Sequence, residues 1–111
     1  MSWNKHRAVE YARTHAGSSS RRQCAHYVSN AIRAGGARLI NTNYAKDMGP
    51  VSGSPQEGDV AVIQPTYGRT EGHACIYDGH GAWYSDFKQR TMYPGDTYRA
   101  QHPPYQLYRH N

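Results

Sequence analysis

Apolar residues recur with helical spacing in the first third of the chain, in two stretches that are each followed by glycine. We therefore predict one helix over residues 4–16 and a second helix over residues 20–34. The apolar positions are Ala8, Val9, Ala12, Ala25, Val28, Ala31 and Ile32. The serines at 18, 19 and 20 are N-cap candidates for the second helix.

Beyond residue 58 the pattern changes to short β-rich runs separated by turn residues. Strands are predicted over 59–64, 73–78 and 82–87, with further short strands at 98–99 and 105–109; the stretches 51–58 and 65–72 are predicted loops, and 44–48 is a predicted helical turn. Helices followed by antiparallel strands predict an α+β fold, with N-terminal helices packed on a small antiparallel β-sheet. A length of 111 residues suits one domain, spanning residues 1–111.

Cys24 occupies a chemically special position, because it falls in the first turn of the second predicted helix. Free backbone amides and the helix dipole favour an anion there, so we expect a lowered thiol pKa and a nucleophilic cysteine. The plainer alternative is a small buried apolar residue, which is the commoner role of a free cysteine.

His73 begins the predicted strand 73–78, and its face is shared with Cys75 and Tyr77. We expect that face to pack on the helix that carries Cys24. If the turn after this strand holds two residues, Asp86 lies on the histidine's face in either register, which makes it our candidate to orient the imidazole. A three-residue turn places Ser85 there instead, and Gln89 is a further alternative.

A zinc site is the competing interpretation of Cys24, His26, His73 and Cys75. Two positions apart on a helix means about 200° of rotation, so Cys24 and His26 would point to opposite sides. We therefore expect neither a metal nor another cofactor.

The chain carries a net charge of +5 with a pI near 9.4, which favours polyanionic partners such as nucleic acid, an anionic membrane or the bacterial cell wall. Its basic residues are scattered along the sequence, however, as on an ordinary solvated surface. Two cysteines make no disulfide framework, and no apolar run is long enough to span a membrane. The first residues also lack the apolar stretch of a secretory signal, so we expect synthesis in the cytoplasm.

Four segments together resemble the CHAP amidases, relatives of the NlpC-type papain-like cysteine peptidases. The stretch 8–36 resembles the helix that carries the nucleophile, and Gly58–Val62 resembles the first core strand. The stretch Gly72–Tyr77 resembles the histidine strand, and 83–89 resembles the strand after it. The resemblance covers most of the chain, with the segments in the order typical of that family.

The resemblance implies a papain-like fold and cleavage of an amide bond in peptidoglycan, with Cys24 as nucleophile and His73 as general base. The third position falls at Ser85 or Asp86, where many NlpC-type relatives have His, Asn or Gln. The chain is also similar to type VI secretion amidase effectors, which act in a rival's periplasm and are neutralised by an immunity protein, and to phage lysin catalytic domains. We expect a monomer that acts on the cell wall and not on nucleic acid. The alternatives are a papain-like hydrolase or deamidase acting on a host protein, and a non-catalytic basic binding module.

Overall fold

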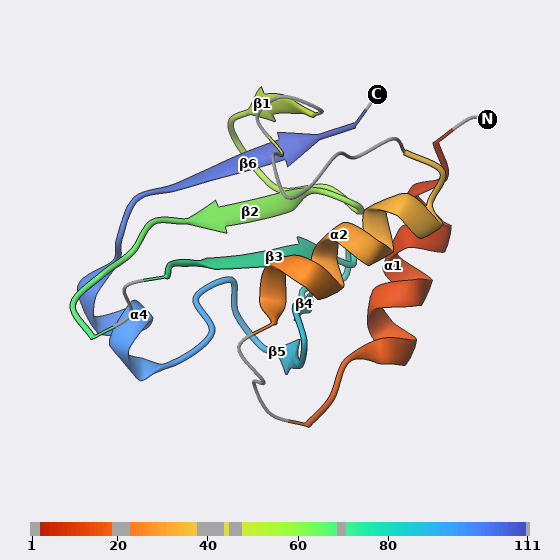
Figure 1. Ribbon diagram of the computed structural model, residues 1–111. Coiled ribbons are helices and arrows are strands. Elements are labelled where there is room, and N and C mark those ends of the chain that lie inside the picture. Colours follow the sequence, from red (N-terminus) through yellow and green to blue (C-terminus); the bar gives the residue numbers. More distant parts are fainter. Residues whose placement is uncertain (1–2, 19–22, 38–43, 45–47, 69–70, 111) are drawn as a thin grey trace.

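The computed structural model describes residues 3–18, 23–37, 44, 48–68 and 71–110 (Figure 1). Two helices precede a six-stranded antiparallel sheet in this part of the chain, and a short helix interrupts the strands near the end. The elements are α1 (Lys5–His15), α2 (Cys24–Ala34), β1 (Gly49–Val51), β2 (Val60–Ile63), β3 (His73–Tyr77), β4 (Trp83–Tyr84), β5 (Lys88–Gln89), α4 (Asp96–Gln101) and β6 (Tyr105–Arg109). The α+β prediction is therefore confirmed.

The two N-terminal helices form where their periodicity predicts them. Asn4 caps α1 by accepting a hydrogen bond from the Arg7 amide at 3.0 Å. α2 ends at Gly35 as predicted, but its N-cap is Gln23, whose side chain makes no capping hydrogen bond. Of the predicted serine caps, Ser19 and Ser20 lie outside the described residues.

The strand order is β1-β6-β2-β3-β4-β5, so the late strand β6 lies inside the sheet between β1 and β2. The predicted strands at 59–64 and 73–78 are confirmed with slightly shorter bounds, and the strand at 105–109 is confirmed with the predicted bounds. β1 forms at residues 49–51, partly within a stretch that the sequence predicts to be a loop, because β6 offers it a partner. Residues 45–47 of the predicted helical turn lie outside the described residues.

Two other strand predictions are wrong. The stretch 82–87 is a strand only at Trp83–Tyr84, after which Ser85–Phe87 turns the chain into β5. Residues 98–99 lie in α4, where Asp96 in the first turn pairs with Arg99 three residues later, at 2.7 Å. A run as short as 98–99 has no measurable periodicity, so its sequence does not distinguish a strand from a helix.

The hairpin between β3 and β4 has the three-residue loop Gly79–Gly81. Tyr77 pairs with Trp83 and Ile76 with Tyr84, so neither of the two registers that place Asp86 on the histidine's face is formed. The Asp78 carboxylate accepts hydrogen bonds from the amides of His80 and Ala82, at 2.7 and 3.0 Å, which stabilises the longer loop.

The helices cover one face of the sheet, with α2 packed on β3 (Figure 1). Their apolar side chains meet those of Val60, Ala74, Ile76 and Tyr84 in the main core. Cys75 lies on the opposite face with Ala61, Trp83 and Leu107. The expectation that the face of Cys75 and Tyr77 packs on α2 is therefore wrong: both faces of β3 are apolar, and the helices cover the other one.

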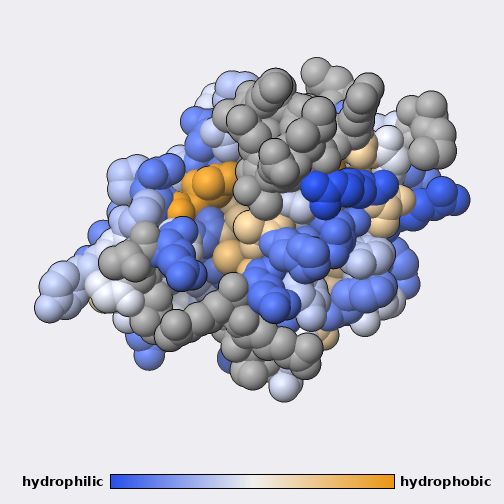
Figure 2. Space-filling model, in the orientation of Figure 1, coloured by the Kyte–Doolittle hydropathy of each residue, from blue (hydrophilic) through white to orange (hydrophobic). Residues whose placement is uncertain are grey.

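The face shown in Figure 2 is largely hydrophilic around a small apolar area. Within the described residues, no helix has the length and apolarity needed to cross a membrane.

Candidate active site

Cys24 is the first residue of α2, where the helix meets the start of β3. The backbone of Ala74 lies within hydrogen-bonding reach of its sulfur, and the backbones of Cys24 and Ala25 also favour the thiolate. Burial nevertheless raises the thiol pKa above its ordinary value, and the charge of Asp86 acts in the same direction. The predicted position is confirmed, but the predicted lowering of the pKa is wrong, because loss of hydration outweighs the nearby amides.

Gly72 sets the approach of the chain to His73. Its φ of 70° lies in the left-handed region, and a Cβ atom there would lie 2.5 Å from the Ile63 carbonyl oxygen. Only glycine fits this close passage beside β2. The Gly-His pair thus places the histidine at the first position of β3, next to the Ala74 backbone that contacts the cysteine sulfur.

Gln89 fixes the orientation of the His73 ring. The Gln89 side-chain amide donates two hydrogen bonds of 3.0 Å, to the carbonyl oxygens of Thr91 and Met92, so its own oxygen must face the histidine. That oxygen lies 2.7 Å from His73 Nε2, which must therefore carry the proton. In the neutral ring, Nδ1 is consequently an acceptor. Burial also lowers the His73 pKa, against the opposing effects of Gln89 and Asp86.

Asp86 is fully buried, and its Oδ2 accepts a hydrogen bond from the Gln23 amide at 3.1 Å. Gln23 directly precedes Cys24, so this contact holds the beginning of α2. The Asp86 charge also acts on both Cys24 and His73, raising the pKa of each. The structure thus places Cys24 and His73 each within electrostatic reach of Asp86, and it makes Gln89, the further alternative from the sequence, the hydrogen-bond partner of the imidazole.

The aromatic rings of Phe87 and Tyr98 lie near His73, with centroid distances of 6.4 and 6.0 Å. The sequence pattern does not mark either residue as part of a site. Among the described residues, no group of three or more His, Cys, Asp or Glu side chains is placed to hold a metal ion.

This arrangement defines a candidate thiol-imidazole site on an α+β scaffold. No protein-family model matches the sequence, and no curated protein matches it. Two solved structures are similar over nearly the whole chain. The native type VI effector–immunity complex Tae3–Tai3 from Ralstonia pickettii contains a chain that is 38% identical, with a TM-score of 0.88 over 98% of this chain and 100% of that one. In the selenomethionine form of that complex the values are 39% identity, a TM-score of 0.82, and coverage of 92% and 98%.

Similarity of this extent places the protein among type VI secretion effectors. The chain belongs to the family of the effector Tae3.

Proposed function

We propose that this protein is an antibacterial effector that hydrolyses an amide bond in the stem peptide of peptidoglycan, through Cys24 and His73 in a papain-like arrangement of the NlpC and CHAP type. The observation that carries the proposal is the position of Cys24: it begins α2 against the first residues of β3, where Gln89 holds His73 at 2.7 Å. Membership of the Tae3 family supports the same conclusion.

The resting site is a neutral pair, because burial raises the pKa of Cys24 and lowers that of His73. In the first step His73 Nδ1 takes the thiol proton as the sulfur attacks the substrate carbonyl. Backbone amides at the start of α2, including that of Cys24, stabilise the oxyanion. The Gln23 amide is already bonded to Asp86. The protonated imidazole then gives its proton to the leaving amine, and water hydrolyses the thioester.

Gln89 and Asp86 have different roles in this proposal. Gln89 bonds the imidazole directly and keeps the proton on Nε2, so it takes the third position of the catalytic set. Asp86 positions the nucleophile instead, through the Gln23 amide, and its negative charge stabilises the imidazolium that forms during reaction.

We further propose that the protein acts in the periplasm and is bound by an immunity protein. The protein would be made in the cytoplasm and act in the periplasm after delivery, where its net charge of +5 favours contact with the anionic wall. The similar structures are effector–immunity complexes, which supports an immunity protein as a partner of this chain.

The test is digestion of purified sacculi, with the released fragments identified by mass spectrometry. Wild-type protein should release new fragments, whereas Cys24→Ala and His73→Ala should release none. Cys75→Ala is the matched control, because Cys75 lies on the face of the sheet away from the helices. Activity retained by folded Cys24→Ala would overturn the thiol mechanism. If folded wild-type protein releases no fragments, the proposal that peptidoglycan is the substrate would be refuted.

A further inference from the structure

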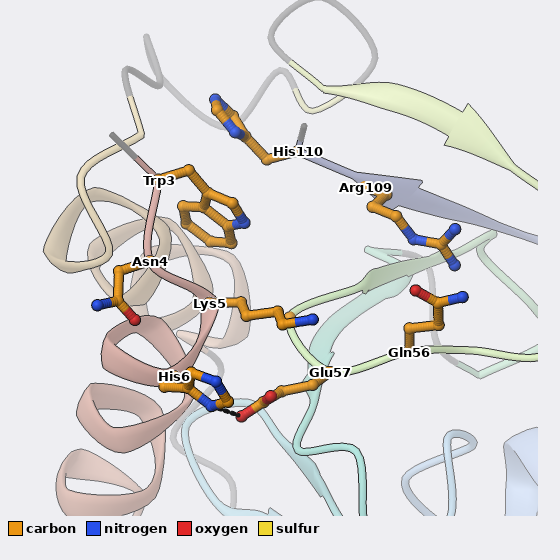
Figure 3. A pocket seen from close by; sticks show the side chains of 9 residues that line it. Trp3, Asn4, Lys5, His6, Gln56, Glu57, Arg109 and His110 are labelled. Atoms are coloured by element: carbon orange, nitrogen blue, oxygen red, sulfur yellow. Dashed lines mark hydrogen bonds and ion pairs between the residues drawn. The ribbon is translucent and has the colours of Figure 1, made fainter. Parts of the chain in front are cut away.

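A cavity lies at the opposite end of α2 from Cys24, between the start of α1, the turn before β2 and the end of β6 (Figure 3). Its volume is ≈ 380 Å³. The Asn4 amide, at its edge, donates to the Gly35 carbonyl at 2.7 Å, which places the cavity beside the C-terminal cap of α2. Eleven helical residues span about 16 Å, so this cavity is separate from the thiol site.

A buried carboxylate organises one wall of this cavity. Asp59 is fully buried and accepts hydrogen bonds from Arg109 Nε and Nη2, at 2.8 and 2.7 Å, and from the Gln56 amide at 2.8 Å. The two-point contact fixes the plane of the guanidinium. Arg109 Nη1 makes no hydrogen bond to the described residues. Its N–H groups are therefore available to a ligand, on a guanidinium that Asp59 holds in place.

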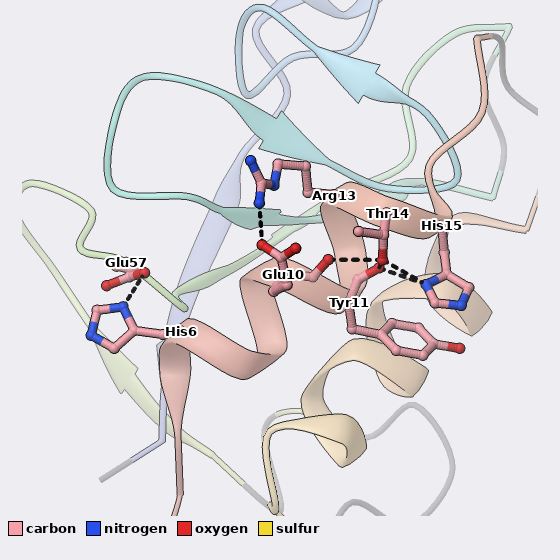
Figure 4. A network of polar contacts seen from close by, with 7 residues as sticks. All are labelled: His6, Glu10, Tyr11, Arg13, Thr14, His15 and Glu57. Carbon is pink, nitrogen blue, oxygen red and sulfur yellow. Dashed lines mark hydrogen bonds and ion pairs between the residues drawn. The ribbon is translucent and has the colours of Figure 1, made fainter.

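Two cationic side chains, Lys5 and Arg109, lie at this cavity beside the carboxylates of Glu57 and Asp59, and only the carboxylates are fully engaged. The Lys5 side chain extends across it (Figure 3) and forms no ion pair with the described residues. Glu57 is already bonded to His6 at 2.7 Å (Figure 4), and Asp59 is bonded to Arg109. His110 adds a buried Nδ1 atom that has no hydrogen-bond partner in the described part of the chain. These groups together favour an anionic ligand.

An aromatic wall completes the cavity. Trp3 lies beside His110, with ring centroids 5.0 Å apart. The indole is seated on glycine backbone: a Cβ atom would lie 2.6 Å from Trp3 at Gly35 and 3.3 Å from it at Gly58. The Gly58 Cβ would also lie 2.9 Å from Lys5 Cβ. Gly35 and Gly58 thus make room for Trp3, and Gly58 also makes room for Lys5.

We propose that this cavity binds the carboxylate end of a short peptide. The carboxylate would lie between Lys5 Nζ and Arg109 Nη1, and the adjoining residue would lie against the Trp3 ring. The choice of a stem peptide as the natural ligand rests on the proposed function. On that basis the cavity would be a second point of attachment to the wall, remote from the bond that is cut.

Trp3 provides a direct probe of binding, since the other tryptophan, Trp83, is buried in the sheet. N-acetyl-D-alanyl-D-alanine should change the tryptophan fluorescence of the Cys24→Ala protein in a saturable way, and its C-terminal amide should not. Trp3→Phe should remove the signal. Lys5→Gln should weaken binding about tenfold, as expected for the loss of one charge-assisted contact. Lys88→Gln is the matched control, because it removes an exposed positive charge on β5.

Equal binding of the acid and the amide would overturn the proposal, as would equal effects of Lys5→Gln and Lys88→Gln. Saturable binding of inorganic phosphate without binding of the peptide would assign the cavity to phosphate instead. The digestion of sacculi reads out the proposed function separately. If the peptide does not bind although the wild-type protein digests sacculi, the cavity proposal is refuted and the proposed function is not.

Discussion

Gln89 accepts a hydrogen bond from His73 Nε2 at 2.7 Å while its own amide nitrogen donates to the carbonyls of Thr91 and Met92. All the hydrogen-bonding directions of this buried side chain are thereby defined, and it cannot rotate without losing three contacts. A neutral amide consequently fixes both the position and the tautomer of the imidazole.

Gln89→Met should reduce hydrolysis by about 10- to 100-fold, which is part of the roughly 10²- to 10⁴-fold that a positioned proton-transfer group contributes. Methionine is of similar length, but its thioether sulfur is only a weak acceptor for a hydrogen bond from the imidazole N–H. The measurement is kcat on a soluble peptidoglycan fragment, together with thermal unfolding. A variant that unfolds near the wild-type temperature and keeps full activity would exclude an orienting role.

Asp86→Asn separates charge from position, because asparagine can still accept the hydrogen bond from the Gln23 amide. Since the Asp86 charge raises the pKa of the Cys24 thiol, its removal should lower that pKa and speed alkylation near neutral pH. Hydrolysis should fall less than in Gln89→Met. A larger loss in Asp86→Asn would instead make Asp86 the third catalytic residue, as the sequence predicted.

The pH profile of kcat/KM should have a broad plateau. The neutral pair exists above the pKa of His73, which burial lowers from 6.5, and below the pKa of Cys24, which burial raises from 9.0. Activity should therefore be lost on acidification with a midpoint below 6.5, as the imidazole becomes protonated. Thiolate absorbance at neutral pH in the resting protein would contradict this order and indicate a preformed ion pair.

Iodoacetamide should modify only Cys24 in the native protein. Cys75 is fully buried, and burial strongly raises its thiol pKa, so it offers neither access nor thiolate. Intact-mass measurement should give one adduct under native conditions and two in urea. Cys24→Ala should give no native adduct. A native adduct on Cys75 would show that the β3 region opens far more readily than the structure implies.

Arg109→Gln should destabilise the fold by about 3 kcal/mol at neutral pH, because it leaves the buried Asp59 carboxylate without its cation. Urea unfolding at pH 7 measures this loss. The double variant Asp59→Asn/Arg109→Gln is the control: it removes the buried charge as well, so it should be less destabilised than Arg109→Gln alone.

The sequence predicts the parts of this site that depend on local pattern. Helical spacing and the terminal glycines place Cys24 at a helix start, and the Gly-His pair places His73 at a strand start. The identity of the residue beside the imidazole depends instead on a loop length. Asp78 stabilises a three-residue turn through the amides of His80 and Ala82, and one added residue shifts the whole pairing.

The sequence favours Asp86 over Gln89 because residues 82–87 resemble one continuous strand. Ser85 and Asp86 are turn-forming residues, and they begin a second hairpin, whose loop also has three residues. Gln89 consequently pairs with Trp83, on the same face as Cys75. The sequence pattern also does not indicate which face of β3 the helices cover. Both faces are apolar, so only the packing of the helices decides between them.

The interior position of β6 makes the sheet depend on pairing between distant parts of the chain. β6 supplies the partner of both β1 and β2, and its last residue, Arg109, pairs with Asp59 fifty positions earlier. Without residues 105–109, β1 and β2 would each lack this strand partner, and the buried Asp59 carboxylate would lack its counter-ion. Removal of these five residues should therefore unfold the sheet that supports His73 and not merely fray one of its edges.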